Sequence, residues 1–454
     1  MVTQQIDLLV LGGGPAGYAA AIRASHLGKR VVLVEKDSIG GTCLNRGCIP
    51  TKALLESAHF YAGLSSAAVH GVSVEIKGLD YAQVVRGKGG IVQNLVNGLQ
   101  FLLRKRQITV LEGEGRLLPS GEVQVGEEVL RPGNVLVATG TEPLQLPGLE
   151  VDGELVVNSD QLLERTSLPQ SLVIVGGGVI GCEFATIFAD YGVEVTIVEL
   201  APRILPMEDG EVSQALTREF KKRKVKVLTE AKVVGIERGA QALVHVEQKG
   251  RAADLRADLV LVSVGRRPVL PPGFQGDLDA KGYIKVNGRF QTSLPQVYAA
   301  GDIIGGVQLA HLAFEEGWAA VNYMFDQPAR NQWFVPSCVY TKPEIAAVGL
   351  TEEQAREKYG EIVTAKYSLK GNGRAVIARE DSGFVKFVAA SDGRVLGVHI
   401  IGPQATELIA GAALALEQGL TLEQWAQVVY PHPTVSESLK EAVLSALGCG
   451  LHSV

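Results

Sequence analysis

The 454-residue sequence contains only five cysteines, eight histidines and no long uncharged apolar run. So few cysteines form no disulfide framework of the kind found in secreted domains, and they suit a reducing compartment. No apolar stretch reaches the roughly 20 residues that a membrane-spanning helix needs. The first structured element is expected at Ile6, which leaves no room for a signal peptide. We therefore expect a cytoplasmic protein without a membrane segment.

An excess of charge of one sign is also lacking. The sequence has 43 Lys and Arg against 49 Asp and Glu, a net charge of −6, so nothing indicates a nucleic-acid partner. The one basic run, residues 218–226, is predicted to be the solvated face of a helix that leads into a strand. The hydrophobic content of 46% and the length predict two to four globular domains.

What the sequence does contain is an internal repeat. Residues 7–36 and 171–200 each read as an apolar strand, a glycine-rich turn, a helix and a second apolar strand that ends at an acid. A constant offset over about thirty residues indicates two copies of one supersecondary unit. The paired landmarks are Gly12 and Gly176, Gly14 and Gly178, Gly17 and Gly181, and Glu35 and Glu199.

Each copy predicts a dinucleotide-binding site. The three glycines permit the tight turn, the approach of a pyrophosphate to the backbone and the packing of helix on strand, and the phosphates lie at the helix N-terminus. Glu35 and Glu199 stand where a ribose is expected. Two such sites suggest electron transfer between two cofactors. A carboxylate at Glu199 favours NAD over NADP, although Arg203 follows four residues later.

Cys43 and Cys48 lie five residues apart in the segment GGTCLNRGCIPTK. In a regular helix their Cα atoms would be about 8.6 Å apart, beyond the limit of about 7 Å for a disulfide. A disulfide therefore requires an irregular segment, for which Asn45 and Gly47 are suited. Pro50 fits the first turn of a following helix, so Cys48 is expected at a helix N-terminus, where a thiolate is stabilised.

Two other interpretations of the cysteine pair are a zinc half-site and two inert buried thiols. Zinc needs about four ligands, and Cys182, Cys338 and Cys449 are scattered without a neighbouring histidine cluster. We therefore expect no metal site and favour redox activity. Lys52, about one turn beyond Cys48, could add positive charge.

His432 is the candidate base. It lies between prolines in the segment YPHPTVSE, which predicts a rigid loop, and Glu437 is placed to hydrogen-bond the imidazole and set its tautomer. Dithiol oxidation needs such a base, because the thiolate is the attacking species. His311 is expected to have a structural role.

In combination, these motifs resemble those of the flavin-dependent disulfide reductases, and most closely the dihydrolipoamide dehydrogenase branch. Later signatures follow in family order along essentially the whole chain: VATG at 137–140, VGRRP at 264–268, AAGD at 299–302, QLAH at 308–311 and HPTVSE at 432–437. The resemblance implies an α/β fold with two Rossmann-like domains, for FAD and NAD, and a C-terminal α+β dimerisation domain. The implied domain limits are 1–146 for FAD, 147–265 for NAD, 266–335 for a central region and 336–454 for the interface.

The resemblance also assigns residues. Cys48 would meet the flavin, Cys43 would exchange with substrate, Glu183 would pair with Lys52, and the pair His432 and Glu437 would act from the partner subunit of a homodimer. The implied FAD residues are Gly12, Gly14, Gly17, Glu35, Lys36, Gly41, Thr42, Lys52, Gly115, Thr139, Gly140, Asp302 and Ala310. The implied NAD residues are Gly176, Gly178, Gly181, Glu199, Val233 and Gly265.

The implied reaction oxidises protein-bound dihydrolipoamide and reduces NAD⁺. The implied partners are the lipoyl domain of an acyltransferase or a glycine-cleavage carrier protein, and the peripheral subunit-binding domain of a 2-oxo acid dehydrogenase complex. Val179 stands where glutathione reductases commonly have tyrosine, and Cys449 alone cannot form the tail pair of mercuric reductases. Arg46 departs from the valine of many dihydrolipoamide dehydrogenases. The alternatives are a glutathione- or mercuric-reductase-like enzyme, a quinone reductase, and a non-catalytic nucleotide-sensing or scaffold flavoprotein.

Overall fold

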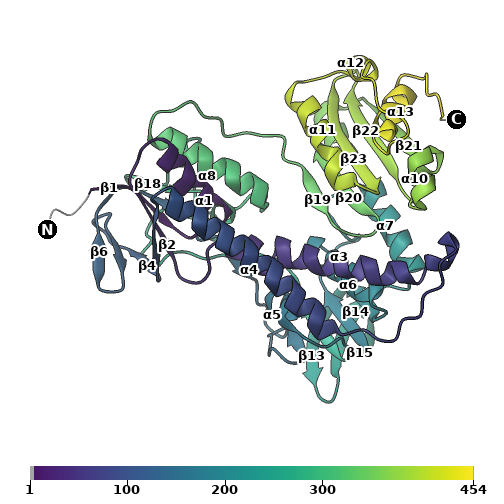
Figure 1. The fold of residues 1–454 in the computed structure, drawn as a ribbon, viewed down its shortest axis with the longest axis horizontal. Helices are drawn as coiled ribbons and strands as arrows, with labels where there is room; N and C mark the ends of the chain where they lie inside the picture. The colour runs from purple at the N-terminus through teal and green to yellow at the C-terminus, as the bar shows by residue number, and fades with distance from the viewer. Residues whose placement is uncertain (1–4, 453–454) are drawn as a thin grey trace.

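The protein, represented by a computed structural model that describes residues 5–452, is built around three five-stranded sheets. Figure 1 shows them as a unit at the left, a unit below and a C-terminal unit at the upper right. The first two sheets are parallel, and the third is antiparallel. This arrangement confirms the predicted α/β class with two dinucleotide-binding units and a C-terminal α+β unit.

The first unit contains the first copy of the repeat. Its sheet order is β18-β7-β1-β2-β3, and β1 pairs in parallel with both β2 and β7. Leu8 and Val10 of β1 pack against α1, whereas Leu9 and Leu11 face the small sheet of β4, β5 and β6 on the other side. Burial on both faces explains why the strand reads as an uninterrupted apolar run. The elements are β1 (Ile6–Leu11), α1 (Pro15–His26), β2 (Val31–Glu35), β3 (Thr109–Glu112), β4 (Gly115–Leu117), β5 (Val123–Val125), β6 (Glu128–Leu130), β7 (Pro132–Val137) and β18 (Val297–Ala299).

The second unit contains the second copy. Its sheet order is β12-β11-β10-β16-β9, so β10 occupies the place that β1 has in the first sheet. Its two faces are covered by α6 and by the antiparallel sheet β13-β14-β15. The elements are β9 (Val156–Val157), α5 (Ser159–Glu164), β10 (Ser171–Val175), α6 (Val179–Asp190), β11 (Glu194–Val198), α7 (Gly210–Lys222), β12 (Lys226–Leu228), β13 (Ala231–Arg238), β14 (Ala242–Gln248), β15 (Arg251–Ala257) and β16 (Leu259–Val262).

The chain enters and leaves the second unit through one two-stranded sheet. Strand β8 (Thr141–Pro143) pairs antiparallel with β17 (Arg266–Pro268), so the two crossings lie side by side. After the return, β18 joins the first sheet, and α8 (Ala310–Met324) packs on α1. A side chain on Gly317 would overlap the backbone of Ala16, so the two helices approach closely.

Helices α3 (Cys48–Leu64) and α4 (Tyr81–Lys105) bridge the first two units. Leu54, Leu55 and Ala58 of α3 belong to the same buried cluster as Phe184 and Phe188 of α6. The segment that carries the two cysteines is therefore held between the two dinucleotide-binding units. The other elements before the last sheet are α2 (Gly41–Arg46), η1 (Ala67–His70) and η2 (Asp302–Ile304).

The C-terminal unit packs its helices against an antiparallel sheet in the order β19-β20-β23-β22-β21. Phe387 and Trp425 meet edge to face in its core, with ring centroids 4.8 Å apart. Its strands are β19 (Ser337–Val339), β20 (Glu344–Gly349), β21 (Ile362–Ser368), β22 (Phe384–Ala390) and β23 (Val395–Gly402). Its helices are α9 (Glu352–Tyr359), η3 (Leu369–Gly371), α10 (Gly373–Ala378), α11 (Ala405–Glu417), α12 (Leu422–Ala426) and α13 (Glu437–Ala446).

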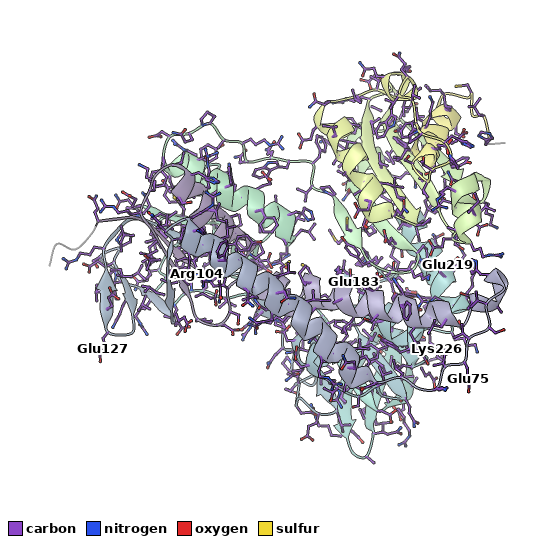
Figure 2. All side chains as sticks on the ribbon, in the orientation of Figure 1. Glu75, Arg104, Glu127, Glu183, Glu219 and Lys226 are labelled. Atoms are coloured by element: carbon purple, nitrogen blue, oxygen red, sulfur yellow. The ribbon has the colours of Figure 1, made fainter. Side chains whose placement is uncertain are left out.

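Two further expectations concern the surface. The basic run at 218–226 forms the end of α7 and the start of β12, and Lys226 lies at the periphery in Figure 2, which confirms the predicted solvated helix that leads into a strand. Within residues 5–452, no helix is long and apolar enough to cross a membrane.

Candidate active site

The two cysteines lie on two helices that meet at Gly47. Cys43 is in the short helix α2, and Cys48 is the first residue of α3, which confirms the predicted position at a helix N-terminus. The expectation of an irregular segment was wrong in its extent, because residues 41–46 are helical and the break is confined to Gly47. A Cβ on Gly47 would lie 3.0 Å from Thr42 O and 3.3 Å from Cys43 Cα, so glycine permits the close approach of the two helices.

The Cys43 and Cys48 side chains are free thiols in hydrogen-bond contact. The hydrogen bond from Cys43 lowers the pKa of Cys48 to about 7; burial opposes this shift and the charge of Lys52 reinforces it. The same hydrogen bond, followed by burial, raises the pKa of Cys43. In the reduced pair these shifts favour the thiolate at Cys48 and the protonated thiol at Cys43.

Lys52 lies one turn into α3 and pairs with Glu183 of α6. Its Nζ atom is 2.9 Å from both carboxylate oxygens. The Glu183 side chain is 5% exposed and lies near the centre of the molecule in Figure 2. Tyr340 N, from the segment after β19, donates to Glu183 Oε1 at 3.0 Å, and Lys52 Nζ lies 4.4 Å from the centroid of the Tyr340 ring. One carboxylate therefore joins all three units beside the cysteines.

The first glycine turn has the geometry of a dinucleotide site. Gly12 has a φ of 102°, which an L side chain rarely adopts, and a Cβ on Gly17 would overlap Gly12 O. Gly14, which precedes α1, provides no side-chain cap, so free backbone N–H groups of the first turn remain for an anion. Glu35 Oε2 accepts from Gly13 N at 2.7 Å. The acid is thus fixed against the turn where the adenosine ribose would lie.

The second turn repeats this geometry. Gly176 has a φ of 107°, and a Cβ on Gly181 would overlap Gly176 O. Gly178, which precedes α6, provides no side-chain cap, and a Cβ on Gly178 would have nothing within 4 Å. Glu199 Oε2 accepts from Gly177 N at 2.5 Å. Two equivalent sites therefore exist, each with an acid beside its glycine turn.

Other residues implied for FAD gather where β7 and β8 meet η2. Thr139 Oγ1 is buried without a hydrogen-bond partner, as expected of an atom that a bound cofactor would satisfy. Thr141 Oγ1 donates to Asp302 Oδ2 at 2.9 Å, and Arg266 Nε donates to Thr141 Oγ1 at 2.8 Å. Gly140 has a φ of 67°. These residues fit a cofactor whose polar groups lie at the ends of β7 and β8.

The remaining implied residues are more dispersed. Gly41 lies against Gly14, and Thr42 accepts a 3.5 Å contact from Arg266 Nη2. Lys36 is exposed, and its Nζ atom lies 3.3 Å from Glu114. Glu114 directly precedes Gly115, the first residue of β4. Ala310 begins α8, and Val233 lies in β13. Gly265 has a φ of 122°, and a Cβ added there would have nothing within 4 Å. No group of three metal-ligating side chains occurs in the part of the chain that the structure describes.

His432 and Glu437 meet at the start of α13. His432 Nδ1 and Glu437 Oε1 are 2.9 Å apart, which confirms the hydrogen bond that the sequence predicted. Partial burial raises the pKa of Glu437, but the Thr434 N–H at 2.9 Å and the His432 ring outweigh it, so the pKa lies below its usual value. The His432 side chain is 79% exposed. The carboxylate thus favours the tautomer with a proton on Nδ1 and leaves Nε2 as the acceptor.

Within one chain, the histidine and the cysteines are far apart. Figure 1 places α12 and α13 at the outer edge of the C-terminal unit, away from the start of α3. The His311 Nε2 atom lies 2.8 Å from Pro336 O, a contact that fits the structural role expected of this residue.

Several polar residues of the site were missed by sequence reasoning. Thr141 donates to Asp302, Arg266 donates to Thr141, and the Tyr340 N–H donates to Glu183 from a distant segment. Glu316 of α8 is buried, which raises its pKa to about 7, and accepts from Gly301 N at 2.8 Å. Arg266 could have been found from its place after Gly265 in the VGRRP motif, but nothing local marks the others. Arg46, the departure noted above, pairs with Asp37.

Comparison with known proteins agrees with this geometry. A model of the pyridine nucleotide-disulphide oxidoreductase family matches residues 6–317, and the model of its dimerisation domain matches residues 335–443. The chain is 41% identical to a dihydrolipoyl dehydrogenase of Bacillus subtilis (strain 168), over 99% of this chain and 100% of that protein. It is 38% identical to the mitochondrial dihydrolipoyl dehydrogenase 1 of Arabidopsis thaliana, over 98% and 91% of the two chains.

Solved structures show the same fold. LpdA from Mycobacterium tuberculosis superposes with a TM-score of 0.89 at 28% identity, over 97% of this chain and 99% of that chain. The HOCl-induced flavoprotein disulfide reductase RclA from Escherichia coli gives a TM-score of 0.86 at 27% identity, over 96% and 99%. The paired thiols, the two glycine turns and these matches lead to one conclusion: the chain belongs to the pyridine nucleotide-disulphide oxidoreductase family, and its C-terminal unit is the dimerisation domain of that family.

Proposed function

We propose that this protein is a homodimeric dihydrolipoamide dehydrogenase, which oxidises the dihydrolipoyl group of a carrier protein and reduces NAD⁺ with bound FAD as intermediate carrier. The observation that carries the proposal is the pair of thiols where α2 meets α3, with Cys48 at the start of α3 and the Lys52–Glu183 ion pair one turn further on. The identity of 41% to a dihydrolipoyl dehydrogenase over the whole chain supports this choice of substrate. For the domain limits we propose 1–146 for the FAD domain, 147–265 for the NAD domain, 266–335 for the central region and 336–454 for the interface domain.

The two glycine turns would hold the two dinucleotides. The unpartnered Thr139 hydroxyl, the Thr141–Asp302 pair and the uncapped start of α1 fit FAD in the first unit. The uncapped start of α6 and Glu199 fit NAD in the second. When bound, FAD supplies a two-electron acceptor next to Cys48, and NAD⁺ supplies the final acceptor of the hydride.

The exchange of disulfides would begin with the pair Cys43 and Cys48 oxidised. The partner's His432 takes the proton from one substrate thiol, and the resulting thiolate attacks Cys43 Sγ. The bond between the two cysteines breaks, and Cys48 leaves as a thiolate. The low pKa of Cys48 makes it the better leaving group, because a less basic thiolate leaves faster.

The second substrate thiol then completes the exchange. The imidazolium of the partner's His432 gives its proton to Cys43 Sγ as that sulfur leaves, and the imidazole takes the proton of the second substrate thiol, whose sulfur attacks the substrate sulfur bound to Cys43. The cyclic disulfide of lipoamide forms, Cys43 ends as a thiol, Cys48 remains a thiolate, and the partner's His432 holds the remaining proton. Two electrons have moved from the substrate dithiol to the cysteine pair. Glu437 would stabilise the imidazolium between the two steps, through the hydrogen bond of 2.9 Å.

The test compares two reactions of the purified dimer. We expect NAD⁺ reduction with dihydrolipoamide and little glutathione reduction with NADPH, and we expect Cys48→Ser to abolish NAD⁺ reduction. A wild-type protein that reduces no NAD⁺ with dihydrolipoamide would contradict the proposal. A protein that binds FAD and yet reacts with no disulfide or dithiol would indicate a sensing or scaffold role.

A second candidate is a flavoprotein disulfide reductase that acts on another disulfide, because the fold also matches the HOCl-induced flavoprotein disulfide reductase RclA with a TM-score of 0.86. That match has 27% identity, against 41% for the dihydrolipoyl dehydrogenase. A panel of low-molecular-weight disulfides and a quinone, each with NADH and with NADPH, separates the two candidates. Preference for dihydrolipoamide over every other donor or acceptor supports the first.

A further inference from the structure

The loop that follows Glu199 forms a rim of the second glycine turn. Leu205 N donates to Gly177 O at 2.8 Å. A Cβ on Gly177 would lie 2.8 Å from the Ile204 side chain and 3.2 Å from Glu199 Cβ, so the loop packs directly on the turn and its acid. A side chain of this loop that pointed inwards would therefore reach the adenosine end of a bound coenzyme.

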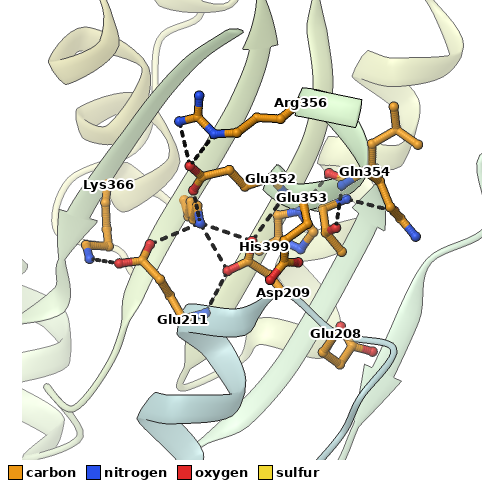
Figure 3. A network of polar contacts seen from close by, with 12 residues as sticks. Glu208, Asp209, Glu211, Glu352, Glu353, Gln354, Arg356, Lys366 and His399 are labelled. Carbon is orange, nitrogen blue, oxygen red and sulfur yellow. Dashed lines mark hydrogen bonds and ion pairs between the residues drawn. The ribbon is translucent and has the colours of Figure 1, made fainter. Parts of the chain in front are cut away.

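The outer side of this loop is fastened to the C-terminal unit. Lys386 of β22 has a side chain only 3% exposed, and its Nζ contacts Asp209 at 3.0 Å, Glu211 at 3.0 Å and Glu352 at 2.7 Å. Asp209 and Glu211 begin α7, whereas Glu352 begins α9. Figure 3 shows these carboxylates converging from the two helices. The network holds the start of α9 against the coenzyme loop.

Arg203 of the loop pairs with Glu353, the second residue of α9. Its Nη1 donates to Glu353 Oε1 at 2.7 Å, and its Nη2 donates to the carbonyl oxygens of Pro206 and Glu208 at 3.4 and 3.3 Å. The pair covers the start of α7, where a Cβ on Gly210 would lie 2.8 Å from Glu353 Oε1 and 2.9 Å from Arg203 Nη1. The guanidinium is therefore directed towards the C-terminal unit and is neutralised there.

This pairing affects the charge that a coenzyme meets. Glu199 is fixed against the glycine turn, where it suits a ribose with a free 2′-hydroxyl. A phosphate on that hydroxyl would be repelled by Glu199 unless a cation lay nearby, and Arg203 is the cation of the adjoining loop. We propose that Glu353 is a positioning residue for coenzyme specificity: by holding Arg203 it excludes the 2′-phosphate of NADP from the second dinucleotide site. This inference rests on the proposed function, in which that site binds NAD.

The Arg203–Glu353 pair can be broken without loss of the fold. Its side chains are 33% and 55% exposed, and exposed ion pairs contribute little to stability. The pair also borders a surface pocket of about 320 Å³ that is lined by residues of the loop and of the start of α9. The buried Lys386 network remains in place when Glu353 changes, so the loop keeps its position.

The test uses two isomeric adenosine nucleotides that differ only in the position of the second phosphate. Binding of ADP, which has a free 2′-hydroxyl, and of 2′,5′-ADP, which has a 2′-phosphate, is measured by calorimetry on the FAD-loaded dimer. We expect Glu353→Gln to shift the ratio of the two dissociation constants roughly tenfold towards 2′,5′-ADP, since a nearby cation acts on a doubly charged phosphate. The shift should shrink as salt is added.

Two further variants make the result decisive. In the double variant Arg203→Met/Glu353→Gln the shift should disappear, because the cation is gone. Glu417→Gln breaks a comparable pair with Arg330, at 2.9 and 3.2 Å, far from the loop in sequence, and should leave the ratio unchanged. An unchanged ratio in Glu353→Gln, or a shift that persists in the double variant, overturns the inference. Wild-type protein that binds neither ADP nor NAD overturns the proposed function instead.

Discussion

Replacing Cys43 by alanine should raise the pKa of the Cys48 thiol in the reduced protein. The hydrogen bond from Cys43 is the largest influence that lowers this pKa to about 7, and burial acts in the opposite direction. A hydrogen bond to a charged group contributes about 1.5–3 kcal/mol, and one pKa unit corresponds to about 1.4 kcal/mol. The loss of the donor should therefore raise the pKa of Cys48 by about 1–2 units.

The assay is the rate of alkylation of Cys48 by iodoacetamide as a function of pH, followed by mass spectrometry of the peptide. The thiolate of the wild-type protein should be lost as the pH falls through about 7, and that of Cys43→Ala should be lost at a higher pH. Cys43→Ser is the matched control, because its hydroxyl can still donate a hydrogen bond and should keep the midpoint near that of the wild type. Equal midpoints in the alanine variant and the wild type would refute the role of the hydrogen bond.

Three other variants test the remaining parts of the structure. Glu437→Gln removes the carboxylate that holds His432 at 2.9 Å, and should lower kcat/KM for dihydrolipoamide by about 10²-fold, measured by steady-state kinetics from pH 6 to 9 with unchanged FAD content. Lys386→Met leaves Asp209 buried without its cation, and should destabilise the C-terminal unit by about 3–5 kcal/mol. Burial raises the pKa of Asp209, but His399 and Lys386 together hold it below its usual value. The stabilisation therefore exists above the unfolded pKa and is lost as the pH falls through the folded pKa. The fall in thermal midpoint should therefore be larger at pH 8 than at a pH below 3.8, the ordinary pKa of an aspartate; an equal fall at both would contradict the pairing. Gly17→Ala places a Cβ on the oxygen of the first glycine turn, and should yield protein that retains little FAD, measured by its absorbance; full retention would contradict the close approach of α1 to the turn.

Much of the fold could be predicted because its signals are local. The apolar runs of β1 and β10, the glycines after them and the acids Glu35 and Glu199 predicted both dinucleotide units. Each depends on a few consecutive residues whose backbone conformations are restricted, such as the φ of 102° at Gly12. The Cys48 position was predicted for the same reason.

The prediction for residues 41–46 failed because it treated the two cysteines as parts of one element. The argument from helical spacing is valid within a helix, but α2 and α3 are separate helices. One residue, Gly47, changes the direction of the chain between them. The spacing of residues predicts their separation only while the helix continues.

Contacts between distant segments were beyond sequence reasoning. Lys386 stands alone in the apolar strand FVKFVAA, which could have marked it as a buried charge, but its three carboxylates come from residues 209, 211 and 352. Tyr340 N reaches Glu183 in the same way, across 157 positions. Neither set of partners follows from spacing or composition.

The sequence by itself therefore determined the two dinucleotide turns, the acids beside them, the placement of Cys48 at a helix start and the pairing of His432 with Glu437, because each involves residues that are close along the chain. The tertiary structure alone decided what Glu183 joins and where the Arg203 guanidinium points. These depend on how separately folded units pack. Packing brings a charge and its partner together whatever their separation along the chain, so only the tertiary structure shows which groups meet.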